Sequence, residues 1–447
     1  MKFEIDRQTI NDLELFDKVK GEKSVFSLFN FTKSIGGKIR LEDMFSHPLT
    51  SIESIEKRLT NIEYFMTFDV GFDVDKECLD FVEYYLAQQN APQHYSAAQS
   101  LFNALKYKIK PKNEYYIVQR GIRYLIVLLN ELYDFSKQLE DEKSNEYIQI
   151  FREAIRKKFE GTTLKATLKF KNRRKLYPQQ FGKLDHCFRK TEISSVRQLL
   201  EFIYEVDVYK SVAFAANKFG FSLPVLNNTS GNFIAQDVYH PFLEHPVAND
   251  FEFINGKNIC FITGPNMAGK STFLKSISIC VYLSHIGFPV PAKYLQTPLF
   301  GGLLTTINLS DNINKGYSHF YNEVLRVKFV AERLNQCGNI FIVFDELFRG
   351  TNVKDAYEAS LSVITAFSKL NRGVFTISTH IIEIAKKLID NQSIFFKYFD
   401  ANLINETPEY NYKIKEGVTN ARLGMYILKK EKVLETIEGA VRKDLSV

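Results

Sequence analysis

The sequence ICFITGPNMAGKST, residues 259–272, runs from a short apolar segment directly into a loop with two glycines. Its first five residues are apolar or β-branched, which is typical of a buried strand. The next eight match the pattern G-x-x-x-x-G-K-[ST], and apolar residues recur at helical spacing after Thr272. A chance match in a chain of this length is on the order of 1–2% at average glycine usage. We therefore predict a strand, a phosphate-binding loop and a helix.

The residue types of this loop suit a nucleotide. Glycines let the backbone turn its N–H groups toward one point, and the N-terminus of the following helix adds partial positive charge there. We expect Lys270 to reach the β- and γ-phosphates and Ser271 to ligate Mg²⁺, so that the predicted cofactors are ATP and Mg²⁺. The predicted nucleotide-binding residues are Gly264, Pro265, Asn266, Met267, Ala268, Gly269, Lys270, Ser271 and Thr272.

Two further strand-like runs end in polar residues. Residues 340–344 lead into Asp345 and Glu346, the Walker B pattern, in which Asp345 holds Mg²⁺ and Glu346 orients or deprotonates the attacking water. Residues 373–378 lead to His380, at the strand end where open α/β sheets bind their ligands, and we predict a sensor of the γ-phosphate or of water. The predicted catalytic residues are Glu346, His380 and Lys270, and the predicted metal ligands are Ser271 and Asp345.

The two halves of the chain differ in pattern. Before about residue 225, apolar residues recur at the spacing of three and four that is typical of helices, for example over 122–132 and 196–208. After a turn-forming cluster at 227–232, short β-like runs alternate with helical patterns, which indicates an α/β sheet with buried parallel strands. We predict a mixed fold: an all-α domain over 1–225, then an α/β P-loop NTPase domain over 226–447.

Composition excludes several classes of protein. A chain of 447 residues favours two or three domains, and 45% apolar with 25% charged residues is ordinary for a globular protein. The five cysteines are scattered without a C-x-x-C pair, which argues against a disulfide framework and against a zinc site. Apolar runs stay far below the roughly 20 residues of a membrane span, and the N-terminus does not resemble a signal peptide. We expect a cytoplasmic protein that does not contact membranes.

Positive charge is concentrated in one segment. Residues 156–190 hold twelve Lys and Arg against two Asp and Glu, whereas the whole chain carries +6. Such a segment indicates contact with a polyanion, most simply nucleic-acid phosphate, and the alternative is a solvated surface loop. Contacts of this kind would hold the DNA backbone without reading its sequence. The predicted DNA-binding residues are Lys169, Lys171, Arg173, Arg174 and Lys175.

These stretches together resemble the MutS family of mismatch-repair ATPases. The loop at 264–272 resembles that family's own phosphate loop, 310–323 its signature loop and 345–351 its Walker B motif with the loop that follows. The first half is similar to the family's helical core domain, more weakly between about 65 and 195. The matching motifs lie at residues 6–15, 27–59, 239–241, 264–272, 287–292, 310–323, 345–351, 379–380 and 413–425.

The resemblance implies an architecture and partners. A helical core or lever domain would precede an ABC-like MutS ATPase domain, and the ATPase domains would pair head to tail in a homodimer. In that pairing Ser318 would contact the γ-phosphate bound to the other subunit, a role compatible with its alternative reading as a helix N-cap. DNA is the expected partner, and a repair protein is a further candidate.

Several positions depart from the family's pattern. The chain begins where the helical core domain begins, so we expect a shortened member without the N-terminal mismatch-recognition domain, and with a reduced clamp at about 100–195. Ala268 replaces a usual Gly and tolerates the loop only with a negative φ. Phe348 replaces another Gly, His319 replaces a Thr, and Pro246 with Val247 stands where an aromatic often faces adenine. We expect slow turnover and looser base selectivity.

The leading hypothesis is an ATP-dependent DNA-binding protein, a nucleotide-switched dimeric clamp in mismatch repair or recombination control. An alternative from another class is an ATP-regulated interaction protein that acts on a protein or RNA partner without mismatch recognition. A third, a transporter- or condensin-like ATPase, is disfavoured because no L-S-G-G-Q-like signature precedes residues 340–346.

Overall fold

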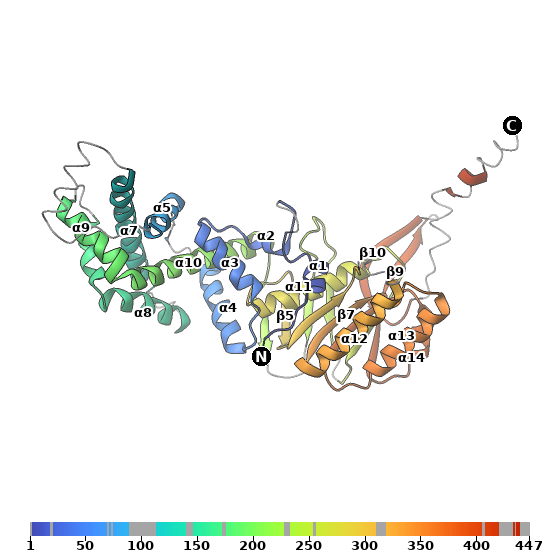
Figure 1. Ribbon diagram of the computed structural model, residues 1–447. Helices are drawn as coiled ribbons and strands as arrows, with labels where there is room; N and C mark the ends of the chain where they lie inside the picture. Colours follow the sequence, from blue (N-terminus) through green and yellow to red (C-terminus); the bar gives the residue numbers. More distant parts are fainter. Residues whose placement is uncertain are drawn as a thin grey trace. The chain divides into compact units, whose positions relative to one another are not determined.

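The structure, a computed structural model, describes residues 2–17, 21–68, 71–72, 75–88, 113–139, 146–171, 176–227, 233–253, 256–309, 319–404, 407–419, 432–433 and 435–438 (Figure 1). The chain forms two compact units. The sheet unit comprises Met1–Leu28, Pro48–Glu56 and Phe219–Val447, and the helical unit comprises Phe29–His47 and Lys57–Lys218. No helix within the described ranges has both the length and the apolar character that a membrane crossing requires.

Helices account for the regular structure described in the helical unit. The predicted helix at 122–132 is confirmed inside α7, and the one at 196–208 inside α10. Ile122, Leu125, Leu129 and Leu132 of α7 are fully buried, as the spacing of three and four predicts. The elements, some of which begin or end in the sheet unit, are α2 (Val25–Phe29), α3 (Ile35–Ser46), α4 (Ile52–Thr67), α5 (Lys76–Leu86), α7 (Asn113–Gln138), α8 (Glu146–Glu160), the 3₁₀ helix η1 (Thr163–Phe170), α9 (Pro178–His186), the π-helix η2 (Cys187–Thr191) and α10 (Ile193–Phe219).

The sheet unit is built on a six-stranded sheet. Its strand order is β10-β9-β4-β8-β7-β6, and among the described strand pairs of this sheet only β10 with β9 is antiparallel. The strands are β4 (Ile259–Thr263), β6 (Gly302–Thr306), β7 (Ile340–Asp345), β8 (Val374–Thr379), β9 (Ile394–Ile404) and β10 (Thr407–Glu416). The three predicted strands are therefore confirmed as β4, β7 and β8, and they lie side by side in the sheet.

Buried side chains cover both faces of this sheet. On one face, Ile259, Phe261 and Ile342 join a core with residues of α12 (His319–Cys337), α13 (Val353–Phe367) and α14 (Ile382–Leu388), three helices that lie together in Figure 1. On the other face, the ring of Phe341 lies 5.6 Å from that of Phe233 and 5.3 Å from that of Phe300. Burial on both faces explains why these strands read as continuous apolar runs.

A second, four-stranded sheet has the order β1-β5-β2-β3. Its strands are β1 (Val225–Asn227), β2 (Ile234–Val238), β3 (Asn249–Glu252) and β5 (Tyr294–Pro298). Phe251 and Phe253 reach the main sheet, because their rings lie 6.4 Å and 5.4 Å from the ring of Phe395 on β9. Helix α11 (Lys270–Ile286), which is buried along most of its length, connects β4 to this second sheet.

The N-terminal residues belong to the sheet unit. Glu4 forms a parallel bridge to Gly302 at the β6 edge, and α1 (Arg7–Asp12) contacts β6. The compact units are therefore discontinuous in sequence, whereas the expected domains were the two halves of the chain. The predicted domain boundary near residue 226 stays a prediction.

Candidate functional site

The loop between β4 and α11, residues 264–269, is here called the glycine loop. Gly264 has φ 153° and Gly269 has φ 104°, values that residues with a side chain rarely adopt. A Cβ on Gly264 would lie 2.8 Å from the carbonyl oxygen of Phe399. The predicted succession of strand, loop and helix is present, and both glycines of the motif occupy positions that require glycine.

Met267 and Ala268 in the loop differ in backbone conformation and in exposure. Met267 has φ 67°, and its side chain is 73% exposed. Ala268 is fully buried and is not among the described residues with positive φ. The sequence condition for Ala268, a negative φ, is therefore met, and its methyl group packs inside the loop.

Lys270 lies at the first position of α11 with its side chain folded over the loop. Its Nζ donates to the carbonyl oxygens of Gly264 at 2.9 Å and Pro265 at 3.0 Å. Burial lowers the pKa of Lys270 below the ordinary lysine value, although the carboxylates of Glu346 and Asp345 counteract part of this effect. The loop thus concentrates one buried cation beside the N-terminus of a helix, where phosphate oxygens are favoured.

The carboxylate of Asp345, at the end of β7, accepts hydrogen bonds from two hydroxyl groups. Ser271 on α11 donates to one of its oxygens and Ser378 on β8 donates to the other. Asp345 itself is buried. Ser378 was not among the predicted site residues, although the parallel pairing of β7 with β8 places it directly beside Asp345.

Glu346 follows β7 in a left-handed conformation, with φ 59°. Its Oε2 lies 2.8 Å from Nε of Arg349 and 3.6 Å from Nδ1 of His380. Interaction with His380, and then the charges of Arg349 and Lys270, lower the pKa of Glu346 against the effect of burial. These contacts therefore favour the ionised carboxylate and orient it in the wall of the site. Arg349, like Ser378, was missed by the sequence reasoning.

The backbone after Glu346 is tied to α12. The side chain of Glu323 accepts hydrogen bonds from the backbone N–H of Arg349 at 3.1 Å and of Gly350 at 3.3 Å. Phe348 has φ 59°, which explains why glycine suits this position, and its buried ring lies 5.6 Å from that of Phe320. Aromatic packing therefore holds a backbone conformation that costs on the order of 1 kcal/mol for a non-glycine residue.

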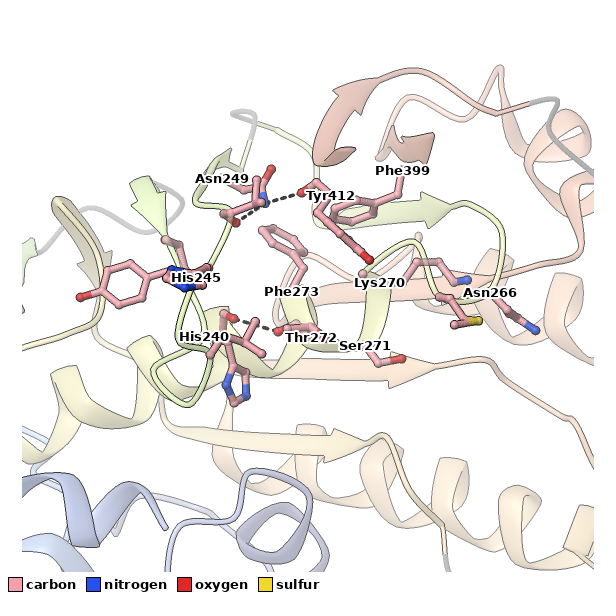
Figure 2. Close-up of a pocket in the computed structure, with 18 of the residues that line it drawn as sticks. His240, His245, Asn249, Asn266, Lys270, Ser271, Thr272, Phe273, Phe399 and Tyr412 are labelled. Carbon is pink, nitrogen blue, oxygen red and sulfur yellow. Dashed lines mark hydrogen bonds between the residues drawn. The ribbon is translucent and has the colours of Figure 1, made fainter. Parts of the chain in front are cut away.

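A pocket of about 620 Å³ opens over the glycine loop. Figure 2 shows Lys270, Ser271 and Asn266 at the loop, with Phe399 and Tyr412 reaching the pocket from β9 and β10. The amide of Asn249 donates to the carbonyl oxygen of Tyr412 at 2.9 Å and so ties β10 to the opposite wall. Within the described part of the chain, the lining residues are Val238, Tyr239, His240, Leu243, His245, Pro246, Val247, Asn249, Asn266, Met267, Gly269, Lys270, Ser271, Thr272, Phe273, Ser276, Glu346, Arg349, Phe399 and Tyr412.

Not every predicted site residue lies in the described part of the chain. Ser318 falls outside it, and α12 begins at the next residue, His319. Within the ranges that the structure describes, no three His, Cys, Asp or Glu side chains converge as a metal cage. An Mg²⁺ ion held by one hydroxyl and one carboxylate needs no such cage, because this ion retains water ligands.

The structure describes two of the five predicted DNA-binding residues. Lys171 pairs with Asp134 of α7, with 2.7 Å between Nζ and Oδ2, in an exposed position. The ammonium of Lys169 lies 5.5 Å from the centre of the Phe170 ring. Arg173, Arg174 and Lys175 lie outside the described residues. The nucleic-acid surface stays a prediction.

Two family models match this chain. A family model for MutS domain III matches residues 8–213, and one for MutS domain V matches residues 260–445. The chain is 33% identical over 187 residues to the DNA mismatch repair protein MutS of Ehrlichia ruminantium (strain Welgevonden), which is 41% of this chain and 23% of that protein.

Two other relatives are similar at lower identity. The DNA mismatch repair protein MutS of Halalkalibacterium halodurans is 28% identical over 247 residues, which is 53% of this chain and 28% of that protein. MutS protein homolog 4 of Mus musculus is 28% identical over 249 residues, which is 53% of this chain and 24% of that protein. The matched region spans about a quarter of the length of these relatives.

Proposed function

Because this chain belongs to the MutS family, we propose that it binds and hydrolyses ATP over the glycine loop and uses the nucleotide to control a dimer on DNA. One observation carries the ATPase part: Lys270, Ser271 and Glu346 line a single pocket, and Asp345 accepts a hydrogen bond from Ser271. These are the four groups that phosphoryl transfer in P-loop proteins needs.

The triphosphate would lie along the glycine loop. The backbone N–H groups of the loop and the N-terminus of α11 would bind its oxygens. The side chain of Lys270 would turn away from the carbonyl oxygens of Gly264 and Pro265 and donate hydrogen bonds to the β- and γ-phosphates instead. The residues fit Mg²⁺, because a serine hydroxyl and a carboxylate, Ser271 and Asp345, already meet beside the loop. When bound there, Mg²⁺ would neutralise charge on the phosphates.

Glu346 would orient and deprotonate the attacking water. It is ionised, it borders the pocket and its carboxylate is held by Arg349, so it can accept a proton next to the γ-phosphate position. His380, which is 56% exposed and lies beside the same carboxylate, fits the predicted role of a sensor for the γ-phosphate or the water.

The wider architecture follows from the same proposal. Residues 226–447 would form the P-loop ATPase domain, and residues 1–225 the helical core or lever domain with a reduced clamp. Two ATPase domains would pair head to tail, with Ser318 reaching the γ-phosphate of the other subunit. ATP binding would then change the dimer, and the helices would carry that change to DNA. The names of the relatives support DNA mismatch repair as the setting.

Steady-state ATPase activity tests this proposal on the full chain. We expect Mg²⁺-dependent turnover that changes on addition of one of three DNA forms: duplex, mismatched or branched. If turnover requires Mg²⁺ but is unchanged by all three DNA forms, the proposed action on DNA is wrong. The ATP-regulated interaction protein, with a protein or RNA partner, then replaces it.

The base of the nucleotide should stack on Tyr412. Among the aromatic residues of the pocket, Phe273 and Phe399 are buried, whereas Tyr412 is 43% exposed. Pro246 and Val247 line the pocket but offer no aromatic face. Tyr412→Ala should raise the Kd for ATP about tenfold, since stacking on a base contributes about 1–3 kcal/mol. Tyr412→Phe, which keeps the ring, is the matched control. Equal affinities of both variants and the parent would contradict the assignment.

Neutralising the basic segment should weaken DNA binding. Changing Lys171, Arg173, Arg174 and Lys175 to glutamine removes up to four phosphate contacts, so the slope of log K against log salt should become shallower by about three to four. Fluorescence anisotropy at several salt concentrations measures it. A control with the same net charge carries glutamine at four exposed positions of the sheet unit: Lys354, Lys369, Lys386 and Lys387. If the slope of log K against log salt changes equally in both variants, the basic segment is an ordinary charged surface and not a DNA-binding site.

A further inference from the structure

The segment before and within α1 is attached to one end of β6. The carboxylate of Asp12, the last residue of α1, is 2% exposed and accepts three hydrogen bonds from beyond its own helix. These come from Thr305 Oγ1 at 2.8 Å, the backbone N–H of Ile307 at 2.9 Å and the backbone N–H of Asn308 at 3.0 Å. Asp12 therefore holds the chain where it leaves β6.

Asp6, which caps the other end of α1, holds α12. Its carboxylate pairs with the guanidinium of Arg326 and also accepts from the backbone N–H of Thr9 at 3.0 Å. Arg326 in turn donates to the carbonyl oxygen of Thr305 at 2.7 Å and to Thr306 Oγ1 at 3.1 Å. Burial raises the pKa of Asp6, but the hydrogen bonds and charge of Arg326 outweigh it and lower that pKa. One partly buried ion pair thus joins α1, β6 and α12.

Two sets of neighbouring residues connect Asp6 and Asp12 to Glu346. On α12, Arg326 lies one turn after Glu323, whose carboxylate accepts the backbone N–H groups of Arg349 and Gly350. Arg349 holds the Glu346 carboxylate at 2.8 Å. On the β6 side, residues 306–309 line a cavity of about 250 Å³ together with Glu323, Glu346 and Arg349.

We propose that Asp12 and Asp6 are positioning residues for ATP hydrolysis, which act by fixing the end of β6 and α12 and thereby the Arg349–Glu346 pair. The inference rests on the proposed ATPase function. Neither aspartate lines the nucleotide pocket, so their effect falls on the orientation of Glu346 and not on the binding of ATP.

Two variants of the full chain distinguish a positioning role in hydrolysis from an effect on the stability of the fold alone. Asp12→Ala removes all three acceptor contacts at the end of β6. Asp6→Asn removes the charge that pairs with Arg326 but keeps a side chain that caps helices as well as aspartate does, so α1 itself stays capped. The matched control is Glu4→Gln. Glu4 pairs with Arg333 of the same helix at 3.2 Å, seven residues beyond Arg326 and farther from Glu323 along α12.

The readouts are the Kd for ATP, kcat and the fraction of active sites from ADP-binding stoichiometry. We expect kcat per active site to fall about tenfold in Asp12→Ala and about threefold in Asp6→Asn, with Kd within about twofold of the parent, because small displacements of a reacting group are costly. Glu4→Gln should keep the parental kcat per active site.

Three results would overturn the inference. If kcat per active site is parental in both aspartate variants while the parent hydrolyses ATP, the positioning role fails and the ATPase proposal stands. If the loss disappears on correction for the active fraction, or Kd rises in step with the fall in kcat, the contacts serve stability alone. If the parent binds ATP without hydrolysing it, the inference and the proposed ATPase function fail together.

Discussion

Replacing Glu346 by glutamine should lower kcat for ATP hydrolysis by about two to three orders of magnitude and leave ATP binding within about threefold of the parent. General-base catalysis contributes about 10²–10⁴-fold, and a glutamine amide cannot accept the proton of the attacking water. The substitution keeps the size of the side chain, and the loop, Lys270 and Asp345 are untouched. Binding and chemistry should therefore separate cleanly in this variant.

Steady-state phosphate release and equilibrium ATP binding measure the two quantities. The control is Glu358→Gln, an exposed glutamate on α13, the helix that follows the same strand. Because the pKa of Glu346 lies below its ordinary value of 4.5, we expect this carboxylate to stay ionised, and available as a base, as the pH falls toward about 4.5. Parental kcat in Glu346→Gln would assign the water-activating role elsewhere.

Lys270→Ala should raise the Kd for ATP by about a hundredfold. Hydrogen bonds to a charged group contribute about 1.5–3 kcal/mol each, and about 1.4 kcal/mol corresponds to a factor of ten in Kd. The ammonium sits among backbone carbonyls at the loop, so its removal also leaves the oxygens of Gly264 and Pro265 without their donor. A modest loss of thermal stability should accompany the loss of affinity.

Isothermal titration with ATP and with ADP checks this second prediction. Lys354→Ala, at an exposed position of α13, controls for the change in net charge. The loss should be larger for ATP than for ADP, since the γ-phosphate is one of the two groups that Lys270 is expected to contact. Unchanged affinity for both nucleotides would mean that Lys270 serves only to fold the loop.

Local sequence signals were sufficient to predict the glycine loop and the residues beside it. Strand β4, the two glycines and Lys270 follow one another directly, so a single motif predicts their geometry. Asp345 and Glu346 could be placed because a fully apolar strand ends at them. Each of these signals lies within about a dozen residues, and buried parallel strands are marked by unbroken apolar runs.

Other site residues depend on contacts between distant parts of the chain. Ser378 meets Asp345 only because β8 pairs with β7 in one particular register. Tyr412 enters the pocket through a hairpin whose position Asn249 fixes from 163 residues away. Asp12 reaches Thr305 across 293 residues. Such pairings are set by tertiary packing, and no periodicity within a single segment indicates them.

The departures from the family's pattern have structural reasons that the sequence alone did not supply. Ala268 is accommodated because the left-handed residue beside it is Met267. Phe348 occupies a left-handed position, and its ring is buried against Phe320. The structure adds an aromatic side chain, Tyr412, to a pocket in which Pro246 and Val247 offer none. The expected looser base selectivity therefore stays open to measurement.

The most direct test of the central claim combines ATP binding and phosphate release on the purified full chain, with Mg²⁺ and with EDTA. The account predicts saturable binding of one ATP per chain and phosphate release that requires Mg²⁺ and is lost in Glu346→Gln. Absence of ATP binding at millimolar concentration, or phosphate release that persists in both EDTA and Glu346→Gln, would contradict the assignment of this pocket as an ATPase site.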